Sequence, residues 1–387
     1  MAAQANSHPL GEHADDSVTK ERVLAAMSGG VDSSVAALLL LDDGYDVTGT
    51  TLKLFSNEDA GIASASACCS LEDIGDAREV AHTLGIPHYV FNFSRSFASG
   101  VMDRFCSGYL RGETPNPCID CNRFVKFEAL QKRRSDLGFD YVATGHYARR
   151  VYDAETGRYL LKKGVDPAKD QSYVLYGASQ EDLAHLLFPL GGLTKQEVRS
   201  IARDAGFVTA DKRESQDICF VPQGDYTTFI EGRLAQTGCS NAMAGTFEPG
   251  PIVNREGKVL GEHRGVAHYT VGQRKGLGLA FSEPLYVCKK DADTNTLVVG
   301  TRSQAQVTKV MADSLNLIAV ETMEQPLRVT VKTQYRSHAE DAWAEQTGDD
   351  TLEVTFDQPH DACAAGQAVV LYDGDTVVGG GTIRQTR

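Results

Sequence analysis

The chain has 387 residues, of which 42% are hydrophobic and 23% charged, and its formal net charge is −14 at pH 7. This length suits roughly two or three globular domains, and the longest apolar run, Val35 to Leu41, is too short to span a bilayer. The acidic balance excludes a protein coated in positive charge for nonspecific nucleic-acid binding, although basic residues cluster between Arg123 and Arg134.

The N-terminal segment is polar and lacks both the basic start and the apolar centre of a secretory signal. We therefore expect residues 1–21 to form a disordered tail. Nine cysteines, an odd number in a chain too large to need disulfide staples, favour a reducing compartment and thiols that react or ligate. These features predict a cytoplasmic protein without a membrane partner.

Strand-like and helix-like segments alternate through residues 22–212. This rhythm predicts an α/β domain whose doubly wound parallel sheet has helices on both faces and binds ligands at the C-terminal ends of its strands. The expected strands span 23–27, 46–54, 88–93 and 141–144, and the expected helices span 35–41, 71–84, 97–110 and 124–137.

The rest of the chain changes in character. Thr194 and Glu197 form a capping box that starts one more helix. After this helix, frequent glycines and prolines divide the chain into short pieces, so we expect residues 213–281 to form a small middle domain. Alternating strands in residues 282–387 predict a small C-terminal β-barrel. Its expected strands span 285–290, 296–299, 327–335, 352–356, 368–372 and 376–383.

The segment from Ser28 to Ser34 joins the first expected strand to the first expected helix. A glycine turn at a helix N-terminus presents unpaired N–H groups and the positive end of the helix dipole, which suits a phosphate chain. Gly29 and Gly30 allow close approach of the anion, the serines add donors, and Asp32 could hold Mg²⁺. A Walker loop requires a lysine after its second glycine, and this segment has none. The segment instead resembles the pyrophosphatase-type loop of enzymes that cleave ATP between its α- and β-phosphates.

Two prolines stiffen the segment from Thr114 to Asn122, which presents Cys118 and Cys121 three positions apart. Such a pair serves redox, metal or nucleophilic chemistry, and zinc is disfavoured because no second pair follows at zinc-ribbon spacing. A distant Cys219 could join the two, but an isolated cysteine is more often a buried structural residue.

Six motifs stand in chain order: SGGVDS (28–33), TPNP (114–117), ATGHY (143–147), KDQSY (169–173), DICF (217–220) and GQRKGLG (272–278). Together they resemble those of the tRNA-specific 2-thiouridylases, and the resemblance runs from about residue 22 to the C-terminus. The resemblance implies that ATP adenylates the C2 oxygen of the wobble uridine in tRNA anticodons, after which sulfur replaces that oxygen. Cys219 would carry the sulfur as a persulfide received from a donor protein, and Cys121 would release it and leave a Cys121–Cys219 disulfide.

The resemblance also implies binding residues for ATP with Mg²⁺ and for the tRNA anticodon region. The uridine would be flipped out of its stack against the proline-stiffened loop. The implied ATP contacts are Ala26, Met27, Ser28, Gly29, Gly30, Val31, Asp32, Ser33, Leu52 and Gly145. The implied tRNA contacts are Asn116, Pro117, Cys118, His146, Lys169, Asp170, Gln171, Gln334, Tyr335 and Gln367.

Cys118 departs from many family members, which carry at this position an aspartate that acts as a base or orients one. Other members have cysteine. If Cys118, Cys121 and Cys219 converge, they could hold a [4Fe–4S] cluster with one iron open to sulfide, an alternative source of sulfur. Two other readings of the whole chain stay open: a small-molecule synthetase with the same ATP loop, and a non-catalytic RNA-binding module. Cys68 and Cys69 have no assigned role.

Overall fold

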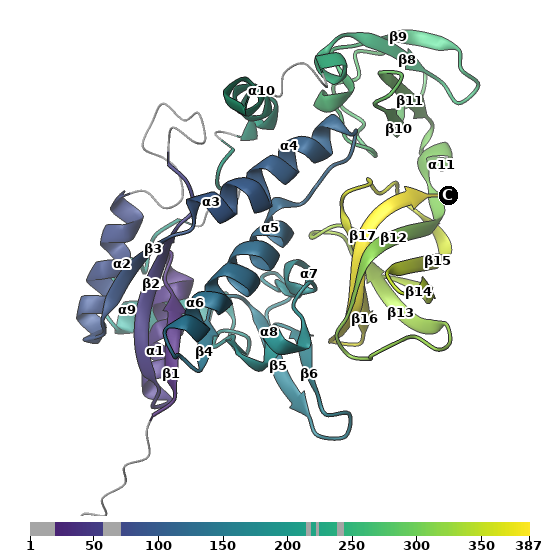
Figure 1. Cartoon of the computed structure of the whole chain (residues 1–387). Helices are drawn as coiled ribbons and strands as arrows, with labels where there is room; N and C mark the ends of the chain where they lie inside the picture. Colours follow the sequence, from purple (N-terminus) through teal and green to yellow (C-terminus); the bar gives the residue numbers. More distant parts are fainter. Residues whose placement is uncertain (1–19, 57–70, 214–217, 222–223, 238–243) are drawn as a thin grey trace, which may run out of the picture.

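The computed structural model describes residues 20–56, 71–213, 218–221, 224–237 and 244–387 (Figure 1). Cys68, Cys69 and nearly all of the expected tail lie outside these ranges. Within them, no helix combines the length and apolar character needed to cross a membrane.

The first part of the chain forms a five-stranded parallel sheet in the order β3-β2-β1-β4-β7. Strand β1 lies inside the sheet, so the loop that follows it opens at the carboxyl edge, where the strand order reverses. The doubly wound α/β prediction is confirmed. The strands are β1 (Arg22–Ala26), β2 (Asp46–Lys53), β3 (His88–Asn92), β4 (Tyr141–Ala143) and β7 (Leu186–Leu187).

Helices cover both faces of this sheet because alternate residues of β1 point to opposite sides. Val23 and Ala25 pack in one apolar cluster with α1, α2 and α9, whereas Leu24 packs in another with the remaining helices. The first group is α1 (Val31–Asp42), α2 (Leu71–Leu84) and α9 (Lys195–Asp204). The second is α3 (Ser94–Phe97), η1 (Ala98–Met102), α4 (Asp103–Leu110), α5 (Pro117–Asp120), η2 (Cys121–Ala129), α6 (Leu130–Asp136), α7 (Ser172–Leu175) and α8 (Gln180–Ala184).

Two of the expected helices contain a wider π-helical stretch. The helix expected over 97–110 includes η1, and the one expected over 124–137 begins earlier, at Cys121, with η2. Such stretches carry an extra residue per turn and often occur at functional sites. Here η2 starts at one of the two thiols that the motifs single out.

A four-stranded sheet in the order β10-β11-β8-β9 forms the middle of the chain. The sequence analysis placed β10 and β11 in the C-terminal barrel, but β11 pairs in parallel with β8, and Leu297 packs on Ile252 in the small core of this sheet. The elements are α10 (Tyr226–Thr237), η5 (Ala244–Phe247), β8 (Gly250–Val253), β9 (Val259–His263), η6 (Val266–His268), β10 (Tyr286–Asp291), β11 (Thr296–Gly300) and α11 (Arg302–Ala305).

The C-terminal strands form the predicted barrel, shown in light green to yellow in Figure 1. The order β12-β15-β14-β13-β16-β17 closes where β17 pairs with β12. The hairpin of β5 (Ala148–Asp153) and β6 (Arg158–Lys163), from the α/β part, extends this sheet where Lys162 pairs with Thr376. The barrel strands are β12 (Val307–Leu317), β13 (Leu327–Lys332), β14 (Glu340–Gly348), β15 (Thr351–His360), β16 (Ala368–Asp373) and β17 (Thr376–Thr386).

Candidate active site

The loop from Ser28 to Ser34 is held in shape by its own serines. The Ser28 N–H donates to Ser33 Oγ at 3.1 Å, and the Ser33 and Ser34 hydroxyls donate to the Gly30 carbonyl at 3.1 and 2.9 Å. Gly29 has a φ of +73°, and a Cβ there would collide with the Asp73 carbonyl oxygen. Only glycine fits this position, and α1 follows directly with its N-terminal N–H groups at the loop.

Gly145 lies against the same loop, as the motif comparison implies. A Cβ on Gly145 would lie 2.9 Å from the backbone nitrogen of Ser33. Met27 and Val31 are buried in the core, and Leu52 packs against the core of the other face. Contacts of Met27 and Val31 with a ligand would therefore come from their backbone.

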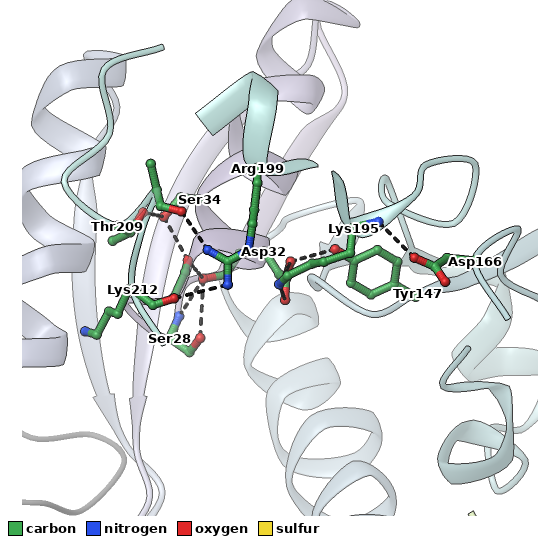
Figure 2. A network of polar contacts seen from close by, with 12 residues as sticks. Ser28, Asp32, Ser34, Tyr147, Asp166, Lys195, Arg199, Thr209 and Lys212 are labelled. Carbon is green, nitrogen blue, oxygen red and sulfur yellow. Dashed lines mark hydrogen bonds and ion pairs between the residues drawn. The ribbon is translucent and has the colours of Figure 1, made fainter. Parts of the chain in front are cut away.

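Asp32 is held by two partners that the sequence analysis did not select (Figure 2). Lys195 Nζ donates to both carboxylate oxygens at 2.7 and 2.8 Å, and the Tyr147 hydroxyl donates to one of them at 2.7 Å. The Lys195 side chain is only 11% exposed. The backbone N–H of Lys195 donates to Asp166 at 3.0 Å, which fixes the first turn of α9 beside the loop.

Further cations surround the loop. Lys212 Nζ donates to the Gly29 carbonyl at 3.1 Å, to Asp73 at 2.7 Å and to Asp76. Although burial disfavours its charged form, the hydrogen bonds to these two carboxylates raise the pKa of Lys212. Arg199 donates to the Lys212 carbonyl at 3.3 Å. In this structure the ammonium groups of Lys195 and Lys212 are paired with carboxylates, and together with the helix N–H groups they are the donors that a polyphosphate at the loop would meet.

The signal that could have identified Lys195 lies in the capping box. Thr194 and Glu197 cap α9 reciprocally, as predicted, so residue 195 occupies the first turn of a helix. A lysine there opposes the helix dipole. Because this charge is unfavourable at the start of a helix, its presence indicates that Lys195 has a stabilising partner elsewhere in the protein.

The thiols Cys118 and Cys121 lie at the start of a short helix that the proline loop prepares. The Asn116 side chain accepts the Cys118 N–H at 3.1 Å, and Pro117 occupies the first helical position. Cys118 is exposed and Cys121 is half-buried. Desolvation raises the pKa of both thiols, and the charge of Lys126 opposes that shift at each.

His146 is buried, with 7% of its surface exposed. Its Nε2 is 3.3 Å from Lys126 Nζ and its Nδ1 is 2.7 Å from Thr144 Oγ1. Burial, followed by the charge of Lys126, holds the pKa of His146 well below its usual value. The ring is therefore neutral and accepts from Lys126 at Nε2. In this conformation His146 supports Lys126 from within the protein.

Replacing Lys126 with methionine should raise the pKa of both thiols further, because it removes the charge that favours their thiolates. Since only the thiolate reacts, alkylation of Cys118 and Cys121 by iodoacetamide should be about threefold slower at pH 8, with the rate profile displaced to higher pH. Peptide mass spectrometry between pH 7 and 10 measures both rates. Lys132→Met, an exposed lysine of α6, is the control. An unchanged profile in Lys126→Met would contradict this role.

Cys219 lies in a turn whose neighbours fix it to the α/β core. The Phe220 ring packs 5.6 Å from Phe97, 5.4 Å from Phe105 and 4.9 Å from Phe229. Cys219 and Cys121 both pack against the same apolar cluster. No disulfide joins them in this structure, and the resemblance implies that bond only as the product of sulfur transfer.

The sequence left open a [4Fe–4S] cluster on condition that Cys118, Cys121 and Cys219 converge, and the structure does not bring these three thiols together as a metal site. No group of three or more His, Cys, Asp or Glu side chains, within the ranges described above, is placed to share a metal ion. Cys219 is held by the packing of Phe220, whereas the other two thiols belong to α5 and η2. The thiols as arranged here do not fit a cluster.

Several residues implied to contact tRNA hold the protein's own backbone. Asp170 accepts from Gly164 and Ser172 at 3.1 Å, and Gln171 accepts the Tyr147 N–H at 3.0 Å. Gln367 donates to the Thr114 carbonyl at 2.6 Å. Asn116 and Pro117 form the start of α5, whereas Gln334 is exposed and Lys169 and Tyr335 are half-buried.

Three domain models match the chain in order. They are described as a tRNA methyl transferase HUP domain over residues 21–223, a tRNA methyl transferase PRC-barrel domain over 242–301 and an aminomethyltransferase β-barrel domain over 307–383. A HUP domain with a loop built for phosphate, followed by two β domains, defines a multidomain protein of the tRNA-modifying class.

The chain is 46% identical over 368 residues to the tRNA-specific 2-thiouridylase MnmA of Acetivibrio thermocellus, covering 95% of this chain and 100% of that protein. The protein of the same name from Desulforamulus reducens is 47% identical, covering 95% and 98%. The solved structure of a 4-thiouridine synthetase–RNA complex with bound ATP is 15% identical, covers 57% of this chain and 52% of that one, and has a TM-score of 0.35. The chain belongs to the tRNA-specific 2-thiouridylase family, which confirms the resemblance inferred from the six motifs.

Proposed function

We propose that the protein is a tRNA-uridine 2-sulfurtransferase that uses ATP to form 2-thiouridine at the wobble position of tRNA anticodons. The main support is that the α/β part carries both of the parts that the reaction needs. A phosphate loop held among Lys195, Arg199 and Lys212 belongs to the same domain as the thiols Cys121 and Cys219. A reaction that first activates a carbonyl oxygen and then replaces it with sulfur needs both parts.

In the activating half, the uridine C2 oxygen attacks the α-phosphate of ATP, and pyrophosphate leaves. Loop N–H groups, Lys195 and Lys212 would stabilise the charge that develops on the phosphates. Mg²⁺, when bound, supplies further charge neutralisation, and Asp32 is the carboxylate placed to hold it once Lys195 turns to a phosphate. The proposed ATP contacts are Ala26, Met27, Ser28, Gly29, Gly30, Val31, Asp32, Ser33, Leu52 and Gly145.

In the transfer half, the outer sulfur of a Cys219 persulfide attacks C2, and AMP leaves. The Cys121 thiolate then attacks the inner sulfur, so that the S–S bond of the persulfide breaks and sulfur stays on the uridine. The product is a Cys121–Cys219 disulfide, which a cellular thiol reductant must reopen. The raised pKa of Cys121 keeps this thiol protonated until its surroundings change.

The partners of the proposed reaction are tRNA and a protein that donates persulfide sulfur. Exposed or half-exposed residues on the barrel and beside α7, Gln334, Tyr335 and Lys169, are proposed to contact the anticodon region. Asn116, Pro117 and Cys118 would lie against the flipped uridine. We place this reaction in the cytoplasm, where tRNA is abundant and the free thiols of the chain stay reduced.

The test is direct. The protein is incubated with ATP, Mg²⁺, a persulfide donor and unmodified tRNA, and the digested RNA is analysed for 2-thiouridine. We expect 2-thiouridine to form only when ATP and donor are both present. Turnover of a small amide or amine acceptor instead would favour a small-molecule synthetase, and tight tRNA binding without pyrophosphate release would favour an RNA-binding module.

A further inference from the structure

The segment that leads into Cys118 is held by an ionic cluster at its first residue, Glu113. One carboxylate oxygen accepts from Arg111 at 2.8 Å, and the other accepts at 3.1 Å from Arg384, a residue of barrel strand β17. The Glu113 side chain is 16% exposed. This carboxylate therefore links the end of α4 to the barrel in partly desolvated surroundings.

A third cation reaches the same residue from the middle sheet. Lys290 of β10 donates to the Tyr269 carbonyl at 2.8 Å and to the Glu113 carbonyl at 3.4 Å, and its Nζ lies 5.6 Å from the Tyr109 ring centre. Lys290 is 8% exposed, and this burial lowers its pKa to about 8 against the favourable charge of Glu113. A buried ammonium bound to carbonyls is costly to keep. Neither half of the proposed reaction uses it.

The barrel binds the next residue of the segment, Thr114, through two hydrogen bonds. Thr114 N–H donates to the Ala365 carbonyl at 2.7 Å, and Gln367 Nε2 donates to the Thr114 carbonyl at 2.6 Å. Gly366 has a φ of +86°, and a Cβ on it would lie 3.2 Å from the Thr114 nitrogen. Two backbones therefore meet closely just before Pro115, and helix α5 with Cys118 and Cys121 follows within a few residues.

We propose that Lys290 and Glu113 are positioning residues for the reaction, through which the middle sheet and the barrel fix the segment 113–117 and thereby the two thiols. Neither residue touches reacting atoms. The inference rests on the proposed function only in assigning chemistry to the thiols, because the fixing of the segment is a property of the fold. It predicts that loss of Lys290 loosens residues 113–117 and slows sulfur transfer without weakening substrate binding.

The experiment compares Lys290→Met with Lys289→Met, its neighbour on β10, whose side chain is 67% exposed and pairs with Asp291. Hydrogen exchange of peptides covering residues 111–120 is followed by mass spectrometry, and kcat and KM for tRNA are measured with ATP and a persulfide donor. In Lys290→Met we expect exchange about tenfold faster, kcat about 10- to 100-fold lower, and a tRNA KM within about twofold. Lys289→Met should match the wild type.

Either of two results overturns the proposal: exchange in Lys290→Met equal to that of Lys289→Met, or faster exchange with an unchanged kcat. If Lys290→Met does not fold, Glu113→Gln, which keeps the side-chain size but removes its charge, is held to the same two criteria. The exchange measurement needs no turnover. A wild-type protein that makes no 2-thiouridine would therefore refute the proposed function while exchange still decides whether Lys290 fixes the segment.

Discussion

Cys219→Ser should make no detectable 2-thiouridine, because a serine hydroxyl cannot accept sulfur as a persulfide. tRNA affinity should stay within a few fold, because phosphate contacts dominate the binding of nucleic acids. Release of pyrophosphate from ATP on tRNA should persist, since activation needs the loop at Ser28 to Ser34 and not this thiol. Liquid chromatography of digested tRNA, filter binding and a pyrophosphate assay measure the three quantities.

The variant Cys121→Ser distinguishes the roles of the two thiols. It should still accept sulfur on Cys219 but should stop after attack on the uridine, which leaves tRNA joined covalently to the protein. Cys288→Ser is the matched control, because Cys288 is also a free, half-buried thiol but lies on β10 in the middle sheet. Normal thiolation by either variant would refute the role assigned to that thiol. A large loss of tRNA affinity in both variants would refute the view that the two thiols serve the chemistry and not the binding of tRNA.

Lys195→Met should lower the rate of pyrophosphate release by about 10²- to 10³-fold, the cost of removing one preorganised charge from a site where negative charge develops. Lys195 is buried and its Nζ binds Asp32 of the loop, and we expect this ammonium to turn from the carboxylate to a phosphate when ATP binds. The tRNA KM should be nearly unchanged. ATP binding by calorimetry and single-turnover pyrophosphate release are the measurements.

Tyr147→Phe tests the same carboxylate from its other side, since it removes one hydrogen bond to Asp32 and leaves Lys195 in place. We expect the rate of pyrophosphate release to fall by less than about tenfold. Lys132→Met on α6 serves as the exposed control, and a thermal melt of each variant reports whether it is folded. Pyrophosphate release by Lys195→Met at the wild-type rate would leave this lysine a purely structural role.

Most of the α/β part could be predicted from local sequence signals. The apolar run before Gly29, the glycine turn and the capping box at Thr194 each have a physical cause within a few residues, and the structure has the sheet, the loop and α9 where these signals placed them. These local signals could single out Lys195 as an unusual residue in the first turn of α9, but they could not say that its partner is Asp32. Lys195 comes from a distant helix, and only the packing of α1 against α9 brings the two together.

The β parts were harder to predict because strand pairing is a long-range choice. Strand β14 was missed since its inward residues, Ala342 and Ala344, are small and give a weak alternating pattern. Strands β10 and β11 were recognised as strands but assigned to the barrel, because nothing in their own residues says that β11 pairs with β8. The iron–sulfur alternative likewise depended on a long-range approach of three thiols, which no local signal predicts, and the structure does not group them as metal ligands.

The hairpin of β5 and β6 has a consequence for how the molecule can be taken apart. It leaves the α/β part just after Gly145 and joins the barrel sheet, where Arg149 and Lys162 also pair with Asp375. A chain ending before the barrel would therefore expose the edge of β6, an invitation to strand pairing between molecules. The two units therefore share one sheet: β6 pairs with barrel strand β17, and its hairpin partner β5 begins three residues after Gly145, which lies beside the phosphate loop.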